Sequence, residues 1–365
     1  MSTLSLEGEK IRFSLLKNNN PFKPDTYAYK TVEFCQNWMK GTDSFELMTS
    51  GSTGQPKKIK LFRKQLESSA RLTIKTLQLS EKDHAFICLN TAYIAGIMML
   101  IRSMEANMKM TVIEPTSRPF QYGEFNEEFT FTALVPMQVK LSINSTKSER
   151  RTLNKFKTII IGGAPVDSFL KNELIELKPA IYGTYGMTET VSHIALKKLN
   201  GPDKEDCFHT LNEVKISTDK RGCLIINGPM TLGKDVITND LVEIIENDKF
   251  NWIGRYDNVI NSGGIKIQAE ELEEKIQAIL IKMGEECRVI VLGVPDSLLG
   301  EKVCLFLEKN DTYGEFRKVF KSILRASLGK FEIPKIIRFI DKFPETPTGK
   351  VDKKQLLHSA INSFR

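Results

Sequence analysis

A stretch dense in glycines and hydroxyls decides how the fold of this chain is interpreted: Thr49-Ser50-Gly51-Ser52-Thr53-Gly54-Gln55-Pro56-Lys57-Lys58. Its glycines permit positive φ angles, so neighbouring backbone N–H groups can turn toward one point. The hydroxyls and the charge of Lys57 would complete a concave site for an anion such as phosphate. The spacing G-x-x-x-x-G-K-[ST] is absent, so this is not a Walker A loop. A solvated surface turn is the alternative interpretation.

The composition around this loop is that of an ordinary globular chain. The 365 residues are 41% hydrophobic and 27% charged, which excludes disordered and collagen-like proteins. This length predicts roughly two domains. Lys plus Arg number 52 against 45 Asp plus Glu, a formal charge of +7. Such an excess suits a small anionic ligand as well as a polyanion, so it does not indicate nucleic-acid binding.

Cysteines and histidines are scattered along the chain. They are Cys35, Cys88, Cys207, Cys223, Cys287, Cys304, His84, His193, His209 and His358. Because no cysteines show C-x-x-C spacing, neither a zinc site nor a disulfide framework is expected. The polar first ten residues predict no signal peptide, and polar residues interrupt the apolar run 85–101, which favours a buried strand plus helix over a membrane span. A cytoplasmic location is the default expectation.

Short apolar runs alternate with segments of helical periodicity. The runs predicted to be buried strands are 85–89, 110–113, 158–161, 223–226, 288–292 and 303–307. Apolar residues recur at steps of three and four within 61–79 and 270–280, which predicts two amphipathic helices. The alternation predicts an α/β fold with largely buried sheets. A polar stretch within 252–261 indicates a domain boundary, after which the last hundred or so residues form a unit of their own.

Three further segments combine glycine, aromatic and charged residues. In Tyr182-Gly183-Thr184-Tyr185-Gly186-Met187-Thr188-Glu189-Thr190 the glycines would admit a flat ligand, and Glu189 offers a hard oxygen for Mg²⁺. Thr238-Asn239-Asp240 and the later Gly254-Arg255-Tyr256-Asp257 supply a carboxylate and a guanidinium that could hold a ribose diol. Pro344-Glu345-Thr346-Pro347-Thr348-Gly349-Lys350 would present Lys350 on a stiffened loop. Each segment, taken alone, could equally be a turn with surface charges.

Together and in this order, the segments resemble the core motifs of the adenylate-forming superfamily of acyl-CoA synthetases, nonribosomal adenylation domains and luciferases. Residues 49–57 resemble T-S-G-[ST]-T-G-x-P-K, and 185–189 resemble Y-G-x-T-E. Residues 254–264 resemble the hinge pattern G-R-x-D-[DN]-x-I-x-x-x-G, and 344–350 resemble P-x-T-x-[ST]-G-K. Two segments depart by one residue each: Asn239 replaces the glycine of T-G-D, and Gly329 replaces the proline of L-P-x-[YF]-x-[IV]-P.

The chain also departs from the superfamily in length. Only about fifty residues precede the loop, so much of the usual N-terminal subdomain is expected to be missing or reduced. That architecture, together with residues 186–193, resembles a shortened type of o-succinylbenzoate–CoA ligase, an enzyme of menaquinone synthesis.

The resemblance implies an α/β fold in two parts. A large N-terminal domain, 1–254, would hold layered β-sheets flanked by helices, and a small mobile α+β domain, 255–365, would swing about a hinge at Asp257. It also implies two half-reactions: a carboxylate attacks the α-phosphate of ATP to give acyl-AMP, and the thiol of coenzyme A then takes the acyl group. Because a carboxylate is already ionised near neutral pH, positioning and charge stabilisation would carry the first step.

The resemblance implies roles for individual residues as well. Lys350, Thr188 and Glu189 would be catalytic, with Lys350 between the carboxylate and the α-phosphate and Glu189 also holding Mg²⁺. The residues expected to bind the nucleotide are Thr49, Ser50, Gly51, Ser52, Thr53, Gly54, Lys57, Gly163, Ala164, Pro165, Thr184, Tyr185, Gly186, Met187, Asp240 and Arg255.

The acyl pocket and the coenzyme A channel would lie near Tyr93, Ser192, His193, Gly263 and Gly264. Tyr93 stands where the family often has a histidine gate, and a core tyrosine is the alternative. His193 could donate to a second carboxylate of the substrate, or could be a satisfied structural histidine. The expected partners are a small carboxylate, ATP and coenzyme A, with no nucleic acid and no membrane span. The sequence predicts no oligomeric state.

Rival interpretations of the function stay open. The acyl group could pass to a carrier protein instead of coenzyme A, or another carboxylate could be used. Asn239 and the short N-terminal region also leave room for a nucleotide-binding module without chemistry. The excess of basic over acidic residues, taken alone, would suggest a nucleic-acid-binding protein, but no stripe of basic and aromatic residues supports that function.

Overall fold

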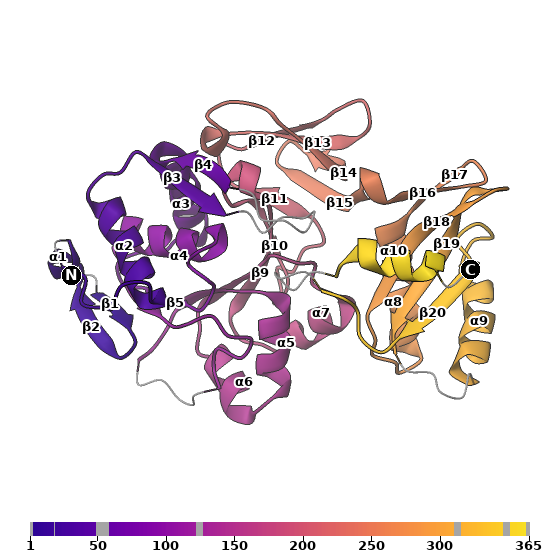
Figure 1. Cartoon of the computed structure of the whole chain (residues 1–365), viewed down its shortest axis with the longest axis horizontal. Helices are drawn as coiled ribbons and strands as arrows, with labels where there is room; N and C mark the ends of the chain where they lie inside the picture. The colour runs from indigo at the N-terminus through magenta and orange to yellow at the C-terminus, as the bar shows by residue number, and fades with distance from the viewer. Residues whose placement is uncertain are drawn as a thin grey trace. The chain divides into compact units, whose positions relative to one another are not determined.

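The computed structural model describes residues 3–17, 19–48, 58–121, 127–309, 315–345 and 351–362. Contacts between residues divide the chain into two compact units (Figure 1). The first unit contains Met1–Ser217, Ile225–Val236 and Ile244–Phe250, and the second contains Thr218–Leu224, Ile237–Glu243 and Asn251–Arg365. Residues 49–57 and Lys350 lie outside the described residues. Within the described ranges, no helix is long and apolar enough to cross a membrane.

The first unit is built from strands and helices in alternation. Its strands are β1 (Thr3–Leu6), β2 (Glu9–Arg12), β3 (Ser44–Met48), β4 (Lys58–Phe62), β5 (His84–Ile87), β6 (Lys109–Val112), β7 (Phe131–Leu134), β8 (Thr158–Ile161), β9 (Ala180–Gly186), β10 (His193–Lys198) and β11 (Phe208–Thr210). Its helices are α1 (Phe13–Leu16), α2 (Tyr27–Met39), α3 (Arg63–Leu77), α4 (Ile94–Glu105), α5 (Pro136–Asn144), α6 (Lys147–Leu153), α7 (Ser168–Ile175) and the 3₁₀ turns η1 (Thr188–Thr190) and η2 (Pro229–Thr231).

One large sheet organises this unit, in the order β15-β11-β10-β9-β8-β7-β5-β6-β1-β2, where β15 is Lys249–Arg255. Its middle strands are parallel from β1 and β6 through β5, β7 and β8 to β9. Beyond β9 the pairing becomes antiparallel. Strands β12 (Lys215–Thr218), β13 (Cys223–Asn227) and β14 (Val236–Glu246) precede β15 in the sheet order, and residues of β12–β15 are divided between the two units. β3 and β4 pair as a separate hairpin.

The parallel strands are buried on both faces. Phe86 of β5 and the next residue but one, Cys88, belong to a core with apolar residues of α5, α6 and α7. Ala85 and Ile87 alternate with them along the strand and are also buried, and α4 packs against β5, with α3 beside it (Figure 1). A strand covered on both faces has no polar alternation, which is why continuous apolar runs in the sequence predicted these strands.

The second unit is a smaller α+β body. Its elements are η3 (Tyr256–Asn258), β16 (Val259–Ser262), β17 (Ile265–Gln268), α8 (Ala269–Lys282), β18 (Val289–Asp296), β19 (Gly300–Glu308), α9 (Glu315–Ser327), β20 (Ile336–Ile340) and α10 (Lys353–Asn362). The sheet order is β17-β16-β19-β18, with β20 parallel to β19. Residues of β19 alternate between two cores: Leu305 packs with α8 and α9, whereas Phe306 packs with Leu356 of α10.

The elements predicted from the sequence are confirmed. The six apolar runs correspond to β5, β6, β8, β13, β18 and β19, and the run 85–101 is a strand followed by α4. The two periodic segments are α3 and α8, except that residues 61–62 belong to β4. A periodic apolar stripe does not show where a preceding strand ends, so the start of α3 could not be read from the pattern alone.

Candidate functional site

The loop that follows β8 needs glycine at its first two positions. A Cβ atom on Gly162 would lie 2.3 Å from Oγ1 of Thr184 in β9, closer than real Cβ contacts. Gly163 has φ +84°, a left-handed conformation that costs other residues free energy. Gly163, Ala164 and Pro165 are exposed. This loop, whose residues Gly163, Ala164 and Pro165 are expected to bind the nucleotide, therefore presents exposed backbone next to Thr184.

The turn between β9 and β10 is held by its own side chains. A Cβ on Gly186 would lie 2.4 Å from Cα of His193, so only glycine lets these two strands approach. The Thr190 hydroxyl accepts a hydrogen bond from Met187 N–H (3.1 Å) and donates one to Ser192 O (2.9 Å). Val191 is buried at φ +67°, a strained conformation for a β-branched residue. The turn thereby fixes Thr188, half-buried, and Glu189, exposed.

These residues fit a nucleotide with a divalent cation. Gly163, Ala164 and Pro165 present exposed backbone beside Thr184. Tyr185 presents a partly buried ring braced against Phe208 (centroids 5.7 Å apart) and Phe250 (5.2 Å). The exposed Glu189 carboxylate is the kind of hard oxygen donor that Mg²⁺ prefers. When bound, such a cation would neutralise phosphate charge.

A buried arginine lies beside this turn, and sequence reasoning missed it. Arg102 of α4 is only 2% exposed. Its Nη2 donates to Ser192 Oγ (2.8 Å) and its Nη1 lies 4.0 Å from the sulfur of Met99, while its Nε finds no partner in the part of the chain that the structure describes. No carboxylate of the described residues forms an ion pair with it. Burial lowers the pKa of Arg102 to about 9, so the guanidinium still carries its charge at neutral pH.

An unpaired buried cation is unusual. Arginine is almost never fully buried without a partner, because removing its charge from water costs several kcal/mol. Among the described residues, Arg102 therefore lacks a counter-charge. The sequence signal was one arginine inside an otherwise apolar helix segment, 96–101.

His193 shares this buried region. Its Nε2 lies 3.0 Å from Oγ1 of Thr73 in α3, and the side chain is 5% exposed. Burial, and secondly the charge of Arg102, hold the pKa of His193 well below its ordinary value. The imidazole is therefore neutral and already hydrogen-bonded, which favours the structural interpretation over a cationic donor.

Tyr93 occupies the position just before α4. It is half-buried, so it is not a core tyrosine. Gly96, one turn later, is required because a Cβ there would lie 2.4 Å from Asn90 O. Helix α4 thus begins tightly against the end of the 85–90 segment, and the same helix carries Arg102 at its other end.

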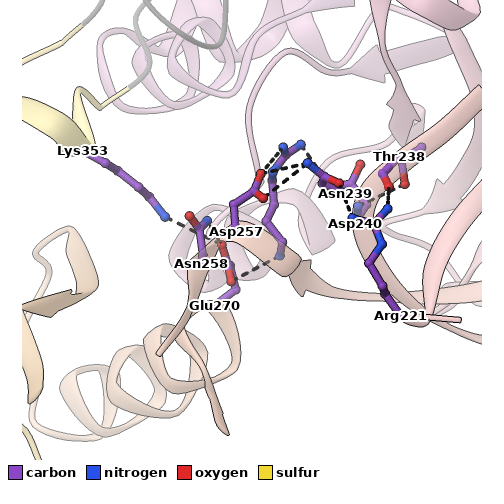
Figure 2. Close-up of polar contacts among 9 residues, drawn as sticks. Arg221, Thr238, Asn239, Asp240, Asp257, Asn258, Glu270 and Lys353 are labelled. Carbon is purple, nitrogen blue, oxygen red and sulfur yellow. Dashed lines mark hydrogen bonds and ion pairs between the residues drawn. The ribbon is translucent and has the colours of Figure 1, made fainter. Parts of the chain in front are cut away.

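In the second unit, Asp240 of the expected ribose site and the expected hinge residue Asp257 both contact Arg255 (Figure 2). Arg255 Nη1 lies 3.5 Å from Asp240 Oδ1, and its Nη2 lies 3.0 Å from Asp257 Oδ2. Asp240 is 6% exposed, and its N–H donates to Thr238 Oγ1 at 3.0 Å. Asp240 and Arg255, predicted from separate motifs, are therefore brought together.

Asn239 makes contacts that the glycine of the family motif could not make. Its Nδ2 donates to both Asp257 oxygens, at 3.3 and 3.1 Å, and its Oδ1 accepts from Arg221 Nη1 at 2.9 Å. Arg221 also donates to Asp219 (2.8 Å) and stacks over Tyr256, 5.1 Å from the ring centroid. Figure 2 shows this bridge from Arg221 through Asn239 to Asp257. The departure from the motif adds a bridge to the expected hinge residue.

The segment after Asp257 is tied to α8. Glu270 accepts hydrogen bonds from Asn258 Nδ2 and, at 3.5 Å, from the Arg255 backbone N–H. Lys353 Nζ lies 3.7 Å from Glu270 Oε1. Gly263 and Gly264, expected near coenzyme A, form the two-residue loop between β16 and β17 with φ +61° and +82°, the conformation of a type I′ hairpin.

The structure gathers the predicted residues into two groups, one in each unit. Residues 162–165, 184–193 and 93 belong to the first unit, and 240, 255, 257 and 263–264 belong to the second. Lys350 and the loop 49–57 lie outside the described residues, so their roles stay predictions.

Comparison with known proteins assigns the chain to a family. The model of the AMP-binding enzyme family matches residues 16–225, more than half of the chain. The chain belongs to the AMP-binding enzymes. The C-terminal domain of this family matches residues 275–350. The family and the two-part α/β fold expected from the motifs are thereby confirmed.

Several AMP-binding proteins resemble this chain over most of its length. An acyl-CoA synthetase (AMP-forming)/AMP-acid ligase II-like protein from Dyadobacter fermentans is 39% identical, with a TM-score of 0.65, and the match covers 95% of this chain and 97% of that one. A 2-succinylbenzoate–CoA ligase from Geobacillus sp. (strain WCH70) is 26% identical over 90% of this chain and 71% of its own length. The fold also matches an O-succinylbenzoate coenzyme A synthetase from Bacillus subtilis in complex with ATP and magnesium (22% identical, TM-score 0.69, covering 85% and 69%).

Proposed function

We propose that this AMP-binding enzyme is an ATP-dependent carboxylate–CoA ligase, and that its substrate is an aromatic dicarboxylate of the o-succinylbenzoate type. The family membership and the names of the 2-succinylbenzoate–CoA ligase relatives support the reaction class. The observation that carries the substrate class is Arg102, a buried and unpaired guanidinium at the strained turn before β10.

The charge on Arg102 selects for a second carboxylate. The carboxylate that is activated must reach the α-phosphate, so a monoacid would leave Arg102 without a partner. A dicarboxylate supplies one group for chemistry and another for the guanidinium, whose planar fork matches a carboxylate in two hydrogen bonds. At about 4 Å and an effective dielectric near 20, such a pair gains on the order of 4 kcal/mol. Ser192, which Arg102 already contacts at 2.8 Å, would orient the fork.

The remaining residues take the roles expected from the motifs. In the proposed reaction Lys350 and the loop 49–57 neutralise the phosphates while the carboxylate attacks, and Thr188 and Glu189 act beside them, with Glu189 as the Mg²⁺ ligand. Gly163, Ala164, Pro165 and Thr184–Met187 face the base, and Asp240 with Arg255 holds the ribose. The domain boundary lies between residues 254 and 255. After adenylation, rotation of the C-terminal domain about Asp257 moves Lys350 away and brings the face that carries Gly263 and Gly264 to the coenzyme A channel, which passes Tyr93.

A screen of carboxylic acids tests this function. Pyrophosphate release from ATP is measured with o-succinylbenzoate and with 4-oxo-4-phenylbutanoate, which lacks only the ring carboxylate. The proposal expects release with the diacid, consumption of free coenzyme A, and much weaker activity with the monoacid. Equal activity on both acids overturns the assignment of the second carboxylate. Transfer only to a phosphopantetheinylated carrier identifies the carrier-loading alternative, and ATP binding without acid-dependent release identifies a non-catalytic module.

The role of Lys350 is separable in the same assay. Lys350→Ala should abolish acyl-AMP formation while leaving transfer from pre-made acyl-AMP to coenzyme A largely intact, because the lysine acts only where two anions meet. The expected loss is two to three powers of ten, which corresponds to about 4 kcal/mol of transition-state stabilisation. Adenylation at a near-wild-type rate would contradict the proposed mechanism.

A further inference from the structure

Three side chains of different chemistry converge on the segment that leads into β11. Glu205, Cys207 and His209 each direct one ligand atom to a common point, and these atoms all lie within 4.8 Å of one another. The sulfur of Cys207 is 3.7 Å from Nε2 of His209, and a carboxylate oxygen of Glu205 contacts the same nitrogen. None of the three residues belongs to the nucleotide or acyl site described above.

The local backbone explains why the three residues share one side. Within β11 the side chains of Phe208 and His209 point to opposite faces, and the 3.7 Å contact with Nε2 of His209 places the Cys207 sulfur on the His209 side. Phe208 is anchored on that other face by Tyr185 and Phe250, with ring centroids 5.7 and 5.5 Å away. Glu205 is held by its backbone N–H, which donates to Lys198 O at 3.0 Å. The cluster therefore sits at the start of β11, a strand that pairs with β10 on one side and with β15 on the other.

The spacing of the ligand atoms suits a tetrahedral transition-metal ion. With a metal–nitrogen bond near 2.05 Å and a metal–sulfur bond of 2.3 Å, the nitrogen and the sulfur of a tetrahedral zinc site stand about 3.6 Å apart. The distance found here is 3.7 Å. The Glu205 oxygen must move outward to admit an ion, which it can do because its side chain is 42% exposed.

We propose that Glu205, Cys207 and His209 form a three-ligand site for Zn²⁺ or a chemically similar divalent transition metal, with the fourth position open to water. A thiolate, an imidazole and a carboxylate together suit a borderline-soft ion and do not suit Mg²⁺ or Ca²⁺, which prefer oxygen donors. The proposal departs from the sequence expectation, which searched only for C-x-x-C spacing.

Neighbouring cations do not occupy the site. Lys249 stands opposite His209 in the sheet but pairs with Glu246 at 3.1 Å, and Lys198 pairs with Asp203 at 3.0 Å. Cys207 also differs from the other cysteines. It is partly exposed, whereas the other five are buried, and burial raises the pKa of each of those five thiols. Reactions of an accessible thiol in the native protein therefore report on Cys207.

Cobalt titration of the full-length, reduced and chelator-treated protein tests the site. Co²⁺ bound to a thiolate gives a charge-transfer absorption band in the near ultraviolet, and Zn²⁺ should displace it. We expect one equivalent to bind, with the band lost in Cys207→Ser. In Glu205→Gln and in His209→Gln the affinity should fall by at least about tenfold, since even the outer partners of metal ligands are worth 10–100-fold. His358→Gln, which changes an exposed histidine elsewhere, is the matched control and should bind like the wild type.

A second readout uses the accessible thiol. Native-state alkylation should modify one cysteine, Cys207, and Zn²⁺ should protect it, while Mg²⁺ should not. Circular dichroism of each variant verifies that the fold is retained. The proposal is overturned if the wild type gives no thiolate band, if the band survives in Cys207→Ser, or if Glu205→Gln or His209→Gln binds as tightly as the wild type.

Discussion

Replacing Arg102 by methionine should move stability and substrate binding in opposite directions. The side chain is fully buried, has no ion-pair partner among the described residues, and is held by a single strong hydrogen bond, to Ser192. Burial lowers the pKa of Arg102 from its ordinary value to about 9, which corresponds to roughly 5 kcal/mol of penalty on the charged form at about 1.4 kcal/mol per pKa unit. Methionine has a similar length and carries no charge, so the variant removes that penalty.

The magnitude expected for the free protein is smaller than the full penalty. Exchanging buried charges for apolar residues of similar volume typically stabilises by about 1–4 kcal/mol. Arg102→Met should therefore raise the unfolding temperature of the ligand-free protein by about 2–4 °C for each kcal/mol gained. Arg102→Lys keeps a charge without the planar fork and should show no such rise.

Arg102→Met should bind the diacid more weakly than the wild type does, although the ligand-free variant should be more stable. The wild type should be stabilised by o-succinylbenzoate in the same thermal assay, because a ligand that binds only the folded state raises its stability. Arg102→Met should lose most of that ligand-dependent shift. If Arg102→Met instead unfolds at a lower temperature without ligand and retains the full shift with it, Arg102 is a structural residue and the reasoning is refuted.

Other substitutions test separate parts of the structure. Asn239→Gly removes the bridge from Arg221 to Asp257. Amide hydrogen exchange at Tyr256–Asn258 should become roughly fivefold faster for each kcal/mol of local stability that is lost. Unchanged exchange would contradict a stabilising role of the bridge. Burial raises the pKa of Glu273 to about 7, so the folded state keeps a proton that the unfolded state releases above pH 4.5, and stability should fall as the pH rises from 4.5 to about 7. Glu273→Gln should flatten that pH dependence and should be more stable than the wild type at pH 8 by up to about 3 kcal/mol. Urea unfolding midpoints of both proteins at pH 5 and pH 8 measure the difference. The same change in midpoint with pH in both proteins would argue against this role of Glu273. Gly186→Ala places a Cβ 2.4 Å from the His193 backbone and should abolish pyrophosphate release, whereas Gly264→Ala, where a Cβ meets open space at φ +82°, should cost only about 1 kcal/mol of stability; similar effects of the two would contradict the steric argument.

The parts of the fold that could be predicted from sequence are those buried on both faces. Strands β5 and β8 are continuous apolar runs because helices cover both sides of the sheet. Strand β14, by contrast, alternates exposed and buried residues over its first half and is exposed at its end. Its sequence therefore carries little apolar signal, and its length comes from pairing with neighbours rather than from its own composition.

The candidate site was predictable where backbone geometry demands a particular residue. Gly163 and Gly186 were found from their motifs, and the structure gives the reasons: a left-handed φ at one and a close strand approach at the other. Arg102 was missed because a single arginine in an apolar helix can extend to solvent, and only the packing of α4 shows that this one does not.

Contacts between segments distant in sequence account for the other differences. Asn239 was recognised as a departure from its motif, but its bond to Asp257 spans 18 positions and appears only in the folded chain. Glu205, Cys207 and His209 are two positions apart, and only the folded chain shows that their ligand atoms meet where the chain enters β11.

The coupling between Arg102 and the ring carboxylate tests the central claim most directly. The ratio of kcat/KM for o-succinylbenzoate to that for 4-oxo-4-phenylbutanoate is measured in the wild type and in Arg102→Met. The account predicts that the wild type prefers the diacid by roughly two to four powers of ten, the 3–5 kcal/mol lost when one partner of a buried pair is removed, and that the variant shows little preference. A ratio that is the same in both proteins would contradict it.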